Sequence, residues 1–420
     1  MTVPGLRVVL DARPLQDPER APLTARYLAG LLGAFDAAPL AGESFVLLLQ
    51  ADLDDPTRRY GQLPIVGRRL LPPTRLLRGG ALAVDPFLLR GAALGAAWRA
   101  DRAGAAGAVY HAAAGSAPVF SRIPIVVTLL DLAPWELPGA FGRGPAARFG
   151  QRLRTRLLRR ATTVLVGTDA VGRSARRLLR LRRDRVRVVP LAPDPAFAET
   201  ASGEALAGER ARLGLPERYL VHVGRFDARH DPTTLLRALA TLAGRPRPSG
   251  LPGDAPWPPP LLVAGASPDD RAALARAAAR LGAGEALVYA PAMPVGRLAT
   301  LVAGARAAVQ PAVSDAAGLP VIDALAAGVP IVASAVGALP ELVGRAGILV
   351  EPRHPDRLAE ALTTVMLDDR LHRTLRAAAD EGRRARPRTW ADVALETRQA
   401  YADAGARAPA PTSAESGTGS

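Results

Sequence analysis

The feature of this sequence that most constrains its fold is a segment in which apolar runs are interrupted by glycine and proline at fixed places. Residues 307–313 are largely apolar and predict a buried strand. A polar break follows, and Pro320 stands where a helix can begin, because its fixed φ suits the first turn and its missing N–H would have no partner there. We expect a helix from about Pro320 to Ala327, a stop at Gly328 and a second strand from Ile331 to Ala333.

A strand, a loop, a helix and a strand in this order form one unit of a parallel α/β sheet. Such sheets bind ligands outside the carboxyl ends of their strands, so Ser314–Leu319 is the expected ligand-binding loop. The N–H groups at the start of the following helix would point toward that ligand. Asp315 in the loop and Asp323 in the helix are eight positions apart. Their spacing alone is equally typical of a loop carboxylate and a charge on a helix face.

The residues around these two carboxylates resemble the signature of the family-4 glycosyltransferases, which have the GT-B fold. The matching positions are Pro311, Asp315, Gly318, Leu319, Pro320, Asp323, Ala324, Ala326, Gly328, Pro330, Gly337, Pro340, Glu341 and Gly347. In that family both carboxylates are normally Glu. The resemblance implies that Asp315 reaches the donor sugar and that Asp323 binds the ribose hydroxyls of the nucleotide. It also places Gly318, Leu319 and Pro320 in the donor site.

The rest of the chain alternates strands and helices in the same way. Its 420 residues are enough for two domains that each bury a core, and the absence of Cys excludes disulfides and thiolate metal sites. We therefore predict an α/β protein with two doubly wound Rossmann-like domains that face a cleft, which is the GT-B arrangement. The predicted domains are 1–192, with a returning helix at 389–404, and 193–388, and the predicted disordered tail is 405–420. Residues 244–260, rich in Pro and Gly, are expected to form a disordered surface loop.

In the first half, family members often carry a glycine-rich loop before an Arg-Tyr pair. Arg26 and Tyr27 are present, but Leu23 and Ala25 stand at the glycine positions, where a Cβ would block a close approach to the donor phosphates.

Relatives also have a His near the reacting sugar, and this chain has Leu130 there, followed by Asp131. His111 lies at a strand end, in a position comparable to one in relatives. The resemblance implies an acceptor-side cleft formed by Arg26, Tyr27, His111 and Asp131. The alternative for His111 is a structural role, with its hydrogen bonds satisfied inside the domain.

In the second half, residues 219–223 predict a strand that ends in Gly224-Arg225. Relatives carry a Lys about five residues later, and their Arg and Lys together hold the donor diphosphate. Here His230 is at the Lys position, with Arg229 beside it, and either side chain could present a hydrogen-bond donor, although neither is an ammonium. The resemblance implies that Arg225, His230 and Asp315 are catalytic and that Gly224 contributes to donor binding. Catalysis would then rest on electrostatic stabilisation of the leaving diphosphate.

The net charge of +15 invites a nucleic-acid or membrane partner. The chain contains no Lys and no Asn, however, so GC-rich coding accounts for part of its Arg content. No nucleic-acid motif accompanies the charge, and we expect no nucleic-acid partner. Arg-rich helices at 141–161 and 172–183 are candidates for contact with an anionic membrane, the alternative being a solvated face. With no signal-peptide pattern and no long apolar stretch, we expect a cytoplasmic protein, with peripheral contact at the inner face of the cell membrane as an option.

Taken together, the resemblance implies a retaining glycosyltransferase of hexosyltransferase type. It would move a sugar from a nucleotide-diphosphate-sugar donor to a glycan or lipid-linked acceptor, with no metal and no other cofactor. Asp52 and Asp54 have the spacing of a metal-binding pair, but chance explains two Asp in a Pro-bounded loop. The main alternative is a GT-B-like protein with a degraded site and a binding or assembly role. An epimerase of the same fold is disfavoured, because those enzymes lack the pattern at 311–330.

Overall fold

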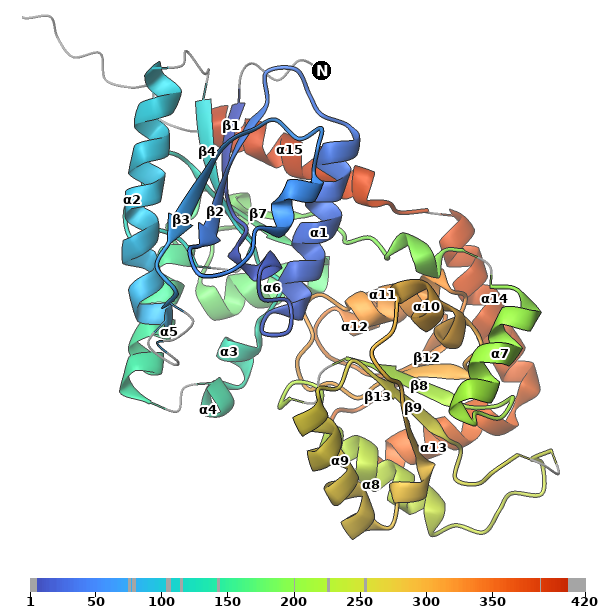
Figure 1. Ribbon diagram of the computed structural model, residues 1–420. Helices are drawn as coiled ribbons and strands as arrows, with labels where there is room; N and C mark the ends of the chain where they lie inside the picture. The colour runs from blue at the N-terminus through green and yellow to red at the C-terminus, as the bar shows by residue number, and fades with distance from the viewer. Residues whose placement is uncertain are drawn as a thin grey trace, which may run out of the picture.

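The chain folds into two α/β domains, each built on one parallel sheet (Figure 1). The computed structural model describes residues 6–74, 77, 81–102, 107–113, 116–141, 144–199, 201–224, 227–252, 255–385 and 387–406. The predicted tail at 405–420 lies almost entirely outside these residues, since only its first two belong to the last helix.

The first sheet has the strand order β3-β2-β1-β4-β5-β6-β7. Its strands are β1 Leu6–Asp11, β2 Ser44–Gln50, β3 Ile65–Leu71, β4 Gly107–Ala112, β5 Ile125–Thr128, β6 Thr163–Val166 and β7 Val186–Val188. All neighbouring strands are parallel. Their carboxyl ends therefore lie along one edge, and the loops that carry Ala12–Leu15, Asp131 and Thr168 leave from that edge.

The second sheet has the strand order β10-β9-β8-β11-β12-β13, again with parallel neighbours. Its strands are β8 Leu220–Val223, β9 Leu261–Ala264, β10 Leu287–Tyr289, β11 Ala307–Gln310, β12 Ile331–Ser334 and β13 Gly347–Val350. The order reverses between β8 and β11, so the loops after these two neighbouring strands meet at the switch point of the sheet, where doubly wound folds bind ligands.

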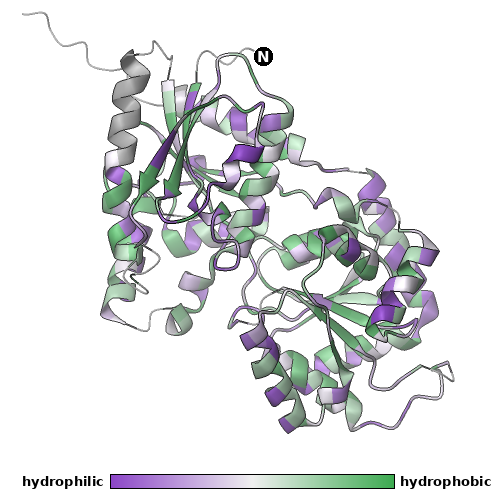
Figure 2. Cartoon of the chain, viewed as in Figure 1, coloured by the Kyte–Doolittle hydropathy of each residue, from purple (hydrophilic) through white to green (hydrophobic). Residues whose placement is uncertain are grey.

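Helices cover both faces of each sheet (Figure 1). The first domain contains α1 Pro22–Ala37, α2 Ala81–Arg102, α3 Ala133–Glu136, α4 Pro138–Phe141, α5 Pro145–Leu158 and α6 Asp169–Leu179. The second contains α7 Gly203–Leu213, α8 Pro232–Ala243, α9 Pro268–Leu281, α10 Val295–Ala303, α11 Leu319–Ala326, α12 Leu339–Val343, α13 Pro355–Leu367 and α14 Asp369–Ala385. The hydrophobic residues concentrate on the strands and the inner helix faces, and the outer helix faces are hydrophilic (Figure 2).

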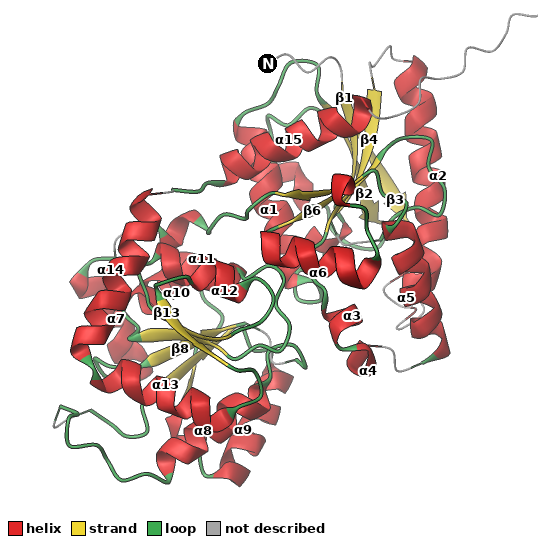
Figure 3. Ribbon diagram, turned by 180° about the vertical axis from the view of Figure 1, so that it is seen from behind, coloured by secondary structure: helices red, strands yellow, loops and turns green. Residues whose placement is uncertain are grey.

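The last helix, α15 Trp390–Ala406, crosses back and packs on the first domain (Figures 1 and 3). The Trp390 ring lies 6.0 Å from the Tyr27 ring and directly over Gly30, where an added Cβ would fall 2.3 Å from the indole. Gly30 is therefore required for close contact between α1 and α15. The first sheet ends at β7 and the second begins at β8, and α7 lies between them in the chain.

The interface between the domains is partly apolar. Ala317 and Leu319, at the start of α11, are buried in the same cluster as Leu191 and Trp390 of the first domain. Burial of this apolar surface, to which both domains contribute, holds the α11 end of the second domain against the first domain.

Two local predictions differ from the structure. The helix expected at 172–183 begins earlier and ends at Leu179, because Arg180 adopts a left-handed conformation with φ 52°. The segment expected to be a disordered loop is held by hydrogen bonds: the Trp257 indole N–H donates to the Leu242 carbonyl at 2.9 Å. Among the described residues, no helix is both long and apolar enough to cross a membrane.

Candidate active site at the domain interface

Asp315 lies in the loop between β11 and α11, and its carboxylate accepts hydrogen bonds from backbone N–H groups of that loop. Oδ1 accepts from the Gly318 N–H at 2.7 Å and from the Ala317 N–H at 3.2 Å, and Oδ2 accepts from Gln310 Nε2 at 3.2 Å. The sequence predicted free N–H groups at this helix start for a ligand. Asp315 uses the N–H groups of Ala317 and Gly318, which precede α11, and the prediction for the N–H groups within the helix stays a prediction.

Glycines hold this loop in place. Gly318 has φ 61°, and Gly337, in the loop after β12, has φ 55°. A Cβ on Gly337 would fall 1.9 Å from the Asp315 carbonyl oxygen, which also accepts from the Ala338 N–H at 2.8 Å. The two loops are therefore in direct backbone contact, and only glycine fits at 337.

Asp323, on the buried face of α11, pairs with Arg26 of the first domain. Arg26 Nη1 lies 2.5 Å from Asp323 Oδ2, and Nη2 donates to Oδ1 at 2.5 Å. Oδ1 also accepts from the Asp194 N–H at 3.0 Å. Burial raises the pKa of Asp323, and the pairing with Arg26 opposes that rise. The predicted donor residue Asp323 and the predicted acceptor-side residue Arg26 thus meet in one bidentate ion pair.

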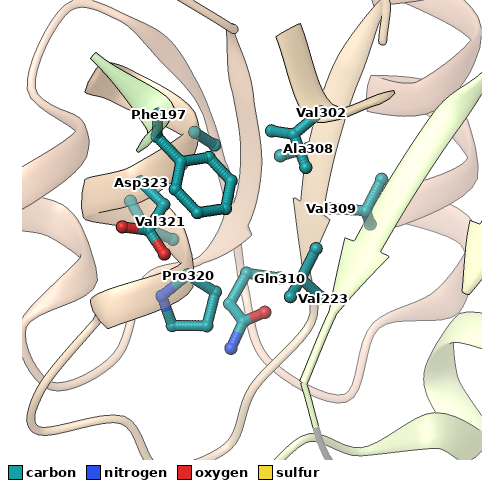
Figure 4. Close-up of a pocket in the computed structure, with 10 residues that line it drawn as sticks. Phe197, Val223, Val302, Ala308, Val309, Gln310, Pro320, Val321 and Asp323 are labelled. Atoms are coloured by element: carbon teal, nitrogen blue, oxygen red, sulfur yellow. The ribbon is translucent and has the colours of Figure 1, made fainter. Parts of the chain in front are cut away.

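The cavity beside Asp323 is small (Figure 4). It measures about 10 Å³ and is lined by Phe197, Gln310, Pro320 and apolar side chains of β8, α10, β11 and α11. That is room for about one water molecule and not for a nucleoside. In this conformation the region around Asp323 is closed by Phe197 and Pro320.

A second charged group lies after β8. Asp227 accepts from His230 Nδ1 at 3.0 Å, and it also pairs with Arg229 through Nε at 2.8 Å and through Nη2. Arg229 Nη1 reaches across the interface to Asp131 Oδ2 at 2.9 Å. Although burial alone would raise the pKa of Asp227, hydrogen bonds from His230 and Arg229 bring that pKa well below its usual range.

The structure therefore joins His230 to Asp131 through Asp227 and Arg229, the residue that the sequence offered beside His230 as a possible donor to the diphosphate. Gly224 ends β8 with φ 151° and lies beside the His230 ring, whose Nε2 would be 3.6 Å from an added Cβ. Arg225, the predicted diphosphate-binding residue, lies outside the described residues.

Two of the predicted acceptor-side residues do not line the cleft. Tyr27 and His111 are buried, and both hydrogen-bond with Thr128 Oγ1, at 2.9 Å and 2.8 Å. His111 Nδ1 is 2.6 Å from the hydroxyl of Tyr401 on α15. Burial lowers the pKa of His111 to about 3. The structural alternative for His111 is therefore correct, because its ring nitrogens join strands to the returning helix.

Three of the positions where family residues are replaced lie in or against the core of the first domain. Ala25 and Leu130 are buried, so their side chains do not project into the cleft, and Leu23 is partly buried and packs against the core.

Two interface contacts were missed by sequence reasoning. Ser314 Oγ donates to Glu136 Oε2 at 2.5 Å, and Glu341 of α12 accepts from the first N–H groups of α6, those of Asp169 at 3.1 Å and Ala170 at 2.9 Å. The Pro-Glu motif at 340–341 was the available signal for the second contact. Among the residues that the structure describes, no three His, Asp or Glu side chains gather as metal ligands.

The two facing sheets, the interdomain site and the returning helix define a GT-B protein, and solved structures agree with this. Sucrose-phosphate synthase of Thermosynechococcus elongatus superposes with a TM-score of 0.68 at 20% identity, covering 95% of this chain and 98% of that one. The Anabaena protein HepE, solved in complex with UDP, superposes with a TM-score of 0.67 at 17% identity, covering 96% and 100%. At sequence identities this low, the similarity to these structures shows a shared fold and nothing about substrates.

The sequence comparisons each match part of the chain. The family model described as "Glycosyl transferases group 1" matches residues 209–382. A D-inositol 3-phosphate glycosyltransferase of Nocardia farcinica is 32% identical over 296 residues. The match covers 67% of this chain and spans 62% of the length of that curated relative.

Proposed function

We propose that this protein is a glycosyltransferase that takes a sugar from a nucleotide-diphosphate-sugar donor. The observation that carries the proposal is the network of Asp227, Arg229 and His230 after β8. It lies at the switch point of the family-matched domain and contacts Asp131 of the opposite domain. It holds two basic side chains where the resemblance expects the donor diphosphate.

The chemistry of this site suits a leaving diphosphate. Arg229 presents a planar guanidinium that can bind phosphate oxygens in a bidentate way, and His230 can donate one further hydrogen bond. The Asp227 carboxylate accepts hydrogen bonds from both Arg229 and His230. A bound diphosphate would therefore compete with that carboxylate for the same donors. Stabilisation of the developing negative charge would be the main contribution of the protein to the rate.

We further propose that transfer occurs with retention and without a metal. Asp315, fixed by its hydrogen bonds with Gln310, Ala317 and Gly318, would face the donor sugar, and no protein nucleophile is needed in this scheme. The donor ribose would bind at Asp323 only after the small cavity there has opened and Arg26 has moved.

The proposed acceptor is a glycan or a lipid-linked glycan, and the cytoplasmic location with peripheral membrane contact is part of the same proposal.

Support for the membrane contact comes from a surface of the first domain where large apolar side chains are exposed beside arginines. Phe87 of α2, Phe149 of α5 and Phe120 are 56%, 55% and 53% exposed, and the Arg90 guanidinium lies 6.0 Å from the Phe120 ring. Aromatic and basic side chains together favour an anionic membrane surface. By contrast, α6 contacts the second domain through Glu341, so the proposed membrane face is restricted to α2 and α5.

One observation favours the alternative of a GT-B protein without transferase activity. Both oxygens of Asp323 are engaged by Arg26, and one also accepts from the Asp194 N–H, so the carboxylate expected to bind ribose instead joins the domains.

A donor panel tests the two functions. The purified protein would be titrated with UDP, GDP and ADP and their glucose conjugates by calorimetry, and nucleotide release would be followed with and without glycan acceptors. Nucleotide binding with turnover supports the transferase. Nucleotide binding without turnover on any acceptor supports the binding role, and no binding of any nucleotide contradicts the proposed function.

A further inference from the structure

A second cavity, separate from the one beside Asp323, opens between α6 and the loop after β12. It measures about 370 Å³ and is lined by Ala170, Arg173, Ser174, Arg177 and Gly337. This volume is at the lower end of the range for small-molecule sites, so it suits a compound the size of a sugar or polyol.

One face of α6 supplies most of the cavity wall. Residues 170, 173, 174 and 177 recur at helical spacing on the same side, whereas Val171, Ala175 and Leu179 are buried against the first domain. The sequence pattern thus separates an apolar face from a basic face on the same helix. Figure 3 shows α6 on the side of the first domain that faces α11 and α12.

The two arginines are suited to an anion. Arg173 and Arg177 are exposed and four residues apart, so their side chains are neighbours on the helix and repel each other. Neither forms an ion pair or a side-chain hydrogen bond with the residues that the structure describes. Two guanidinium groups with a hydroxyl from Ser174 between them match a dianionic phosphomonoester in charge and in number of donors.

The other polar groups near the cavity do not supply this positive charge. The N–H groups that begin α6 are taken by the Glu341 carboxylate, and Asp169 is exposed at the same helix end. The positive charge available to a ligand therefore comes from the arginines in the second and third turns and not from the helix N-terminus.

The position of the cavity connects it to the candidate active site. Its opposite wall is Gly337, which packs on the backbone of Asp315, and α6 follows β6, the neighbour of the strand that leads to Asp131. A compound held by Arg173 and Arg177 would thus lie at the domain interface, one loop away from Asp315.

We propose that Arg173, Ser174 and Arg177 bind the phosphomonoester of a small phosphorylated acceptor. The identification of the ligand as the acceptor rests on the proposed transferase function, but the anion site itself can be tested without turnover. The phosphate could belong to a free sugar phosphate or to a lipid headgroup, and both share this chemistry.

The test measures binding of glucose 6-phosphate, with glucose and glucuronate as probes that lack the phosphate, in the presence of saturating UDP. The Arg173→Gln, Arg177→Gln double variant removes two charges from the cavity. The Arg180→Gln, Arg183→Gln double variant removes two charges from exposed positions beyond the end of α6 and serves as the matched control. We expect glucose 6-phosphate to bind more tightly than either other probe, and its affinity to fall at least tenfold in the cavity variant only.

Vesicles distinguish the two sources of phosphate. The phosphate would be assigned to a lipid if the unmodified protein binds vesicles of phosphatidic acid and phosphatidylcholine but not glucose 6-phosphate, and if the cavity variant loses the vesicle binding. No binding of either phosphate probe, or an equal loss in both double variants, would overturn the proposed site. Absence of UDP binding in the unmodified protein would instead count against the proposed donor function. The measurements with the phosphate probes could still be interpreted, because they do not depend on turnover.

Discussion

Arg26 of α1 and Asp323 of α11 form a bidentate ion pair across the two domains, although they are 297 residues apart in the sequence. Asp323 is 4% exposed at its side chain and Arg26 is 29% exposed. A buried carboxylate needs such a partner, because removal of a charge from water is costly unless it is paired. The pair therefore links stability, domain closure and the region where the donor ribose is expected.

Arg26→Gln should destabilise the protein, because it leaves the buried Asp323 carboxylate with only the Asp194 N–H. The loss of one partner from a fully buried pair typically costs 3–5 kcal/mol, and we expect about 2 kcal/mol here because Arg26 is partly exposed. This corresponds to roughly 4–8 °C in the melting temperature of a domain of this size. Asp323→Asn in the same background should restore part of the loss, and Arg58→Gln, at an exposed side chain, should change the melting temperature little. Equal melting temperatures for Arg26→Gln and the unmodified protein would contradict the prediction.

Arg26→Gln should also increase UDP affinity if Asp323 binds the donor ribose. The guanidinium and the ribose diol would compete for the same two oxygens, so its removal frees the carboxylate. Calorimetry with UDP, and with uracil as a control that lacks the ribose, separates this effect from a general change. A lower UDP affinity in the variant would show that the ion pair supports nucleotide binding.

Asp315→Glu should increase turnover of the donor, by up to about 100-fold, if the protein is a slow transferase. The added methylene extends the carboxylate by about 1 Å toward the donor sugar, and a misplacement of that size can change a rate by this factor. The longer side chain should lose the hydrogen bonds from the N–H groups of Ala317 and Gly318, at a cost of about 1 kcal/mol in stability. Nucleotide release by Asp315→Glu, Asp315→Ala and the unmodified protein would be measured in parallel. No nucleotide release by any of the three proteins, with nucleotide still bound, would favour the binding role.

His111 should make the protein less stable at acidic pH. Its pKa is about 3 in the folded protein and about 6.5 in the unfolded chain, so between these values only the unfolded state binds the proton. Stability should therefore fall as pH decreases through this window, with a contribution from His111 of about 1.4 kcal/mol per pH unit.

His111→Gln should have a shallower dependence of unfolding free energy on pH between about 6 and 4 than the unmodified protein. His354→Gln is the control, since His354 is exposed and makes only a surface pair with Glu351. Urea unfolding at several pH values measures the slopes. Identical slopes for the unmodified protein and His111→Gln would mean that His111 is not buried as a neutral ring.

Phe149→Ser should reduce binding to vesicles that contain phosphatidylglycerol, because it removes an exposed aromatic ring from the α2–α5 face. The effect should be larger at low salt, where the neighbouring arginines attract the anionic surface most strongly. Co-sedimentation measures binding, and Val295→Ser, at an exposed apolar side chain of the second domain, is the control. Binding that depends neither on anionic lipid nor on salt would exclude this membrane contact.

Local patterns in the sequence were enough for much of the fold. The proline at position 320 and the glycine at 328 predicted α11 and β12 within one residue, because helix ends and strands depend on nearby residues. The apolar run at 307–313 predicted the start of β11 correctly, but the strand ends three residues earlier, at Gln310. Strand β3 was not predicted, since Ile65–Leu71 is an edge strand with Gly67, Arg68 and Arg69 at its centre and lacks the continuous apolar run of a central strand.

The site depended more on tertiary structure. Asp315 and Asp323 were found from the sequence, but their partners were not, because 54 basic and 39 acidic side chains allow many pairings and only the fold brings Arg26 to Asp323 and Arg229 to Asp131. The sequence could suggest two roles for His111, and burial against Tyr401 of the returning helix decided between them. Periodicity and capping are local properties of the chain, whereas ion pairs, burial and shifted pKa values depend on residues that meet only when the two domains and the last helix have packed together.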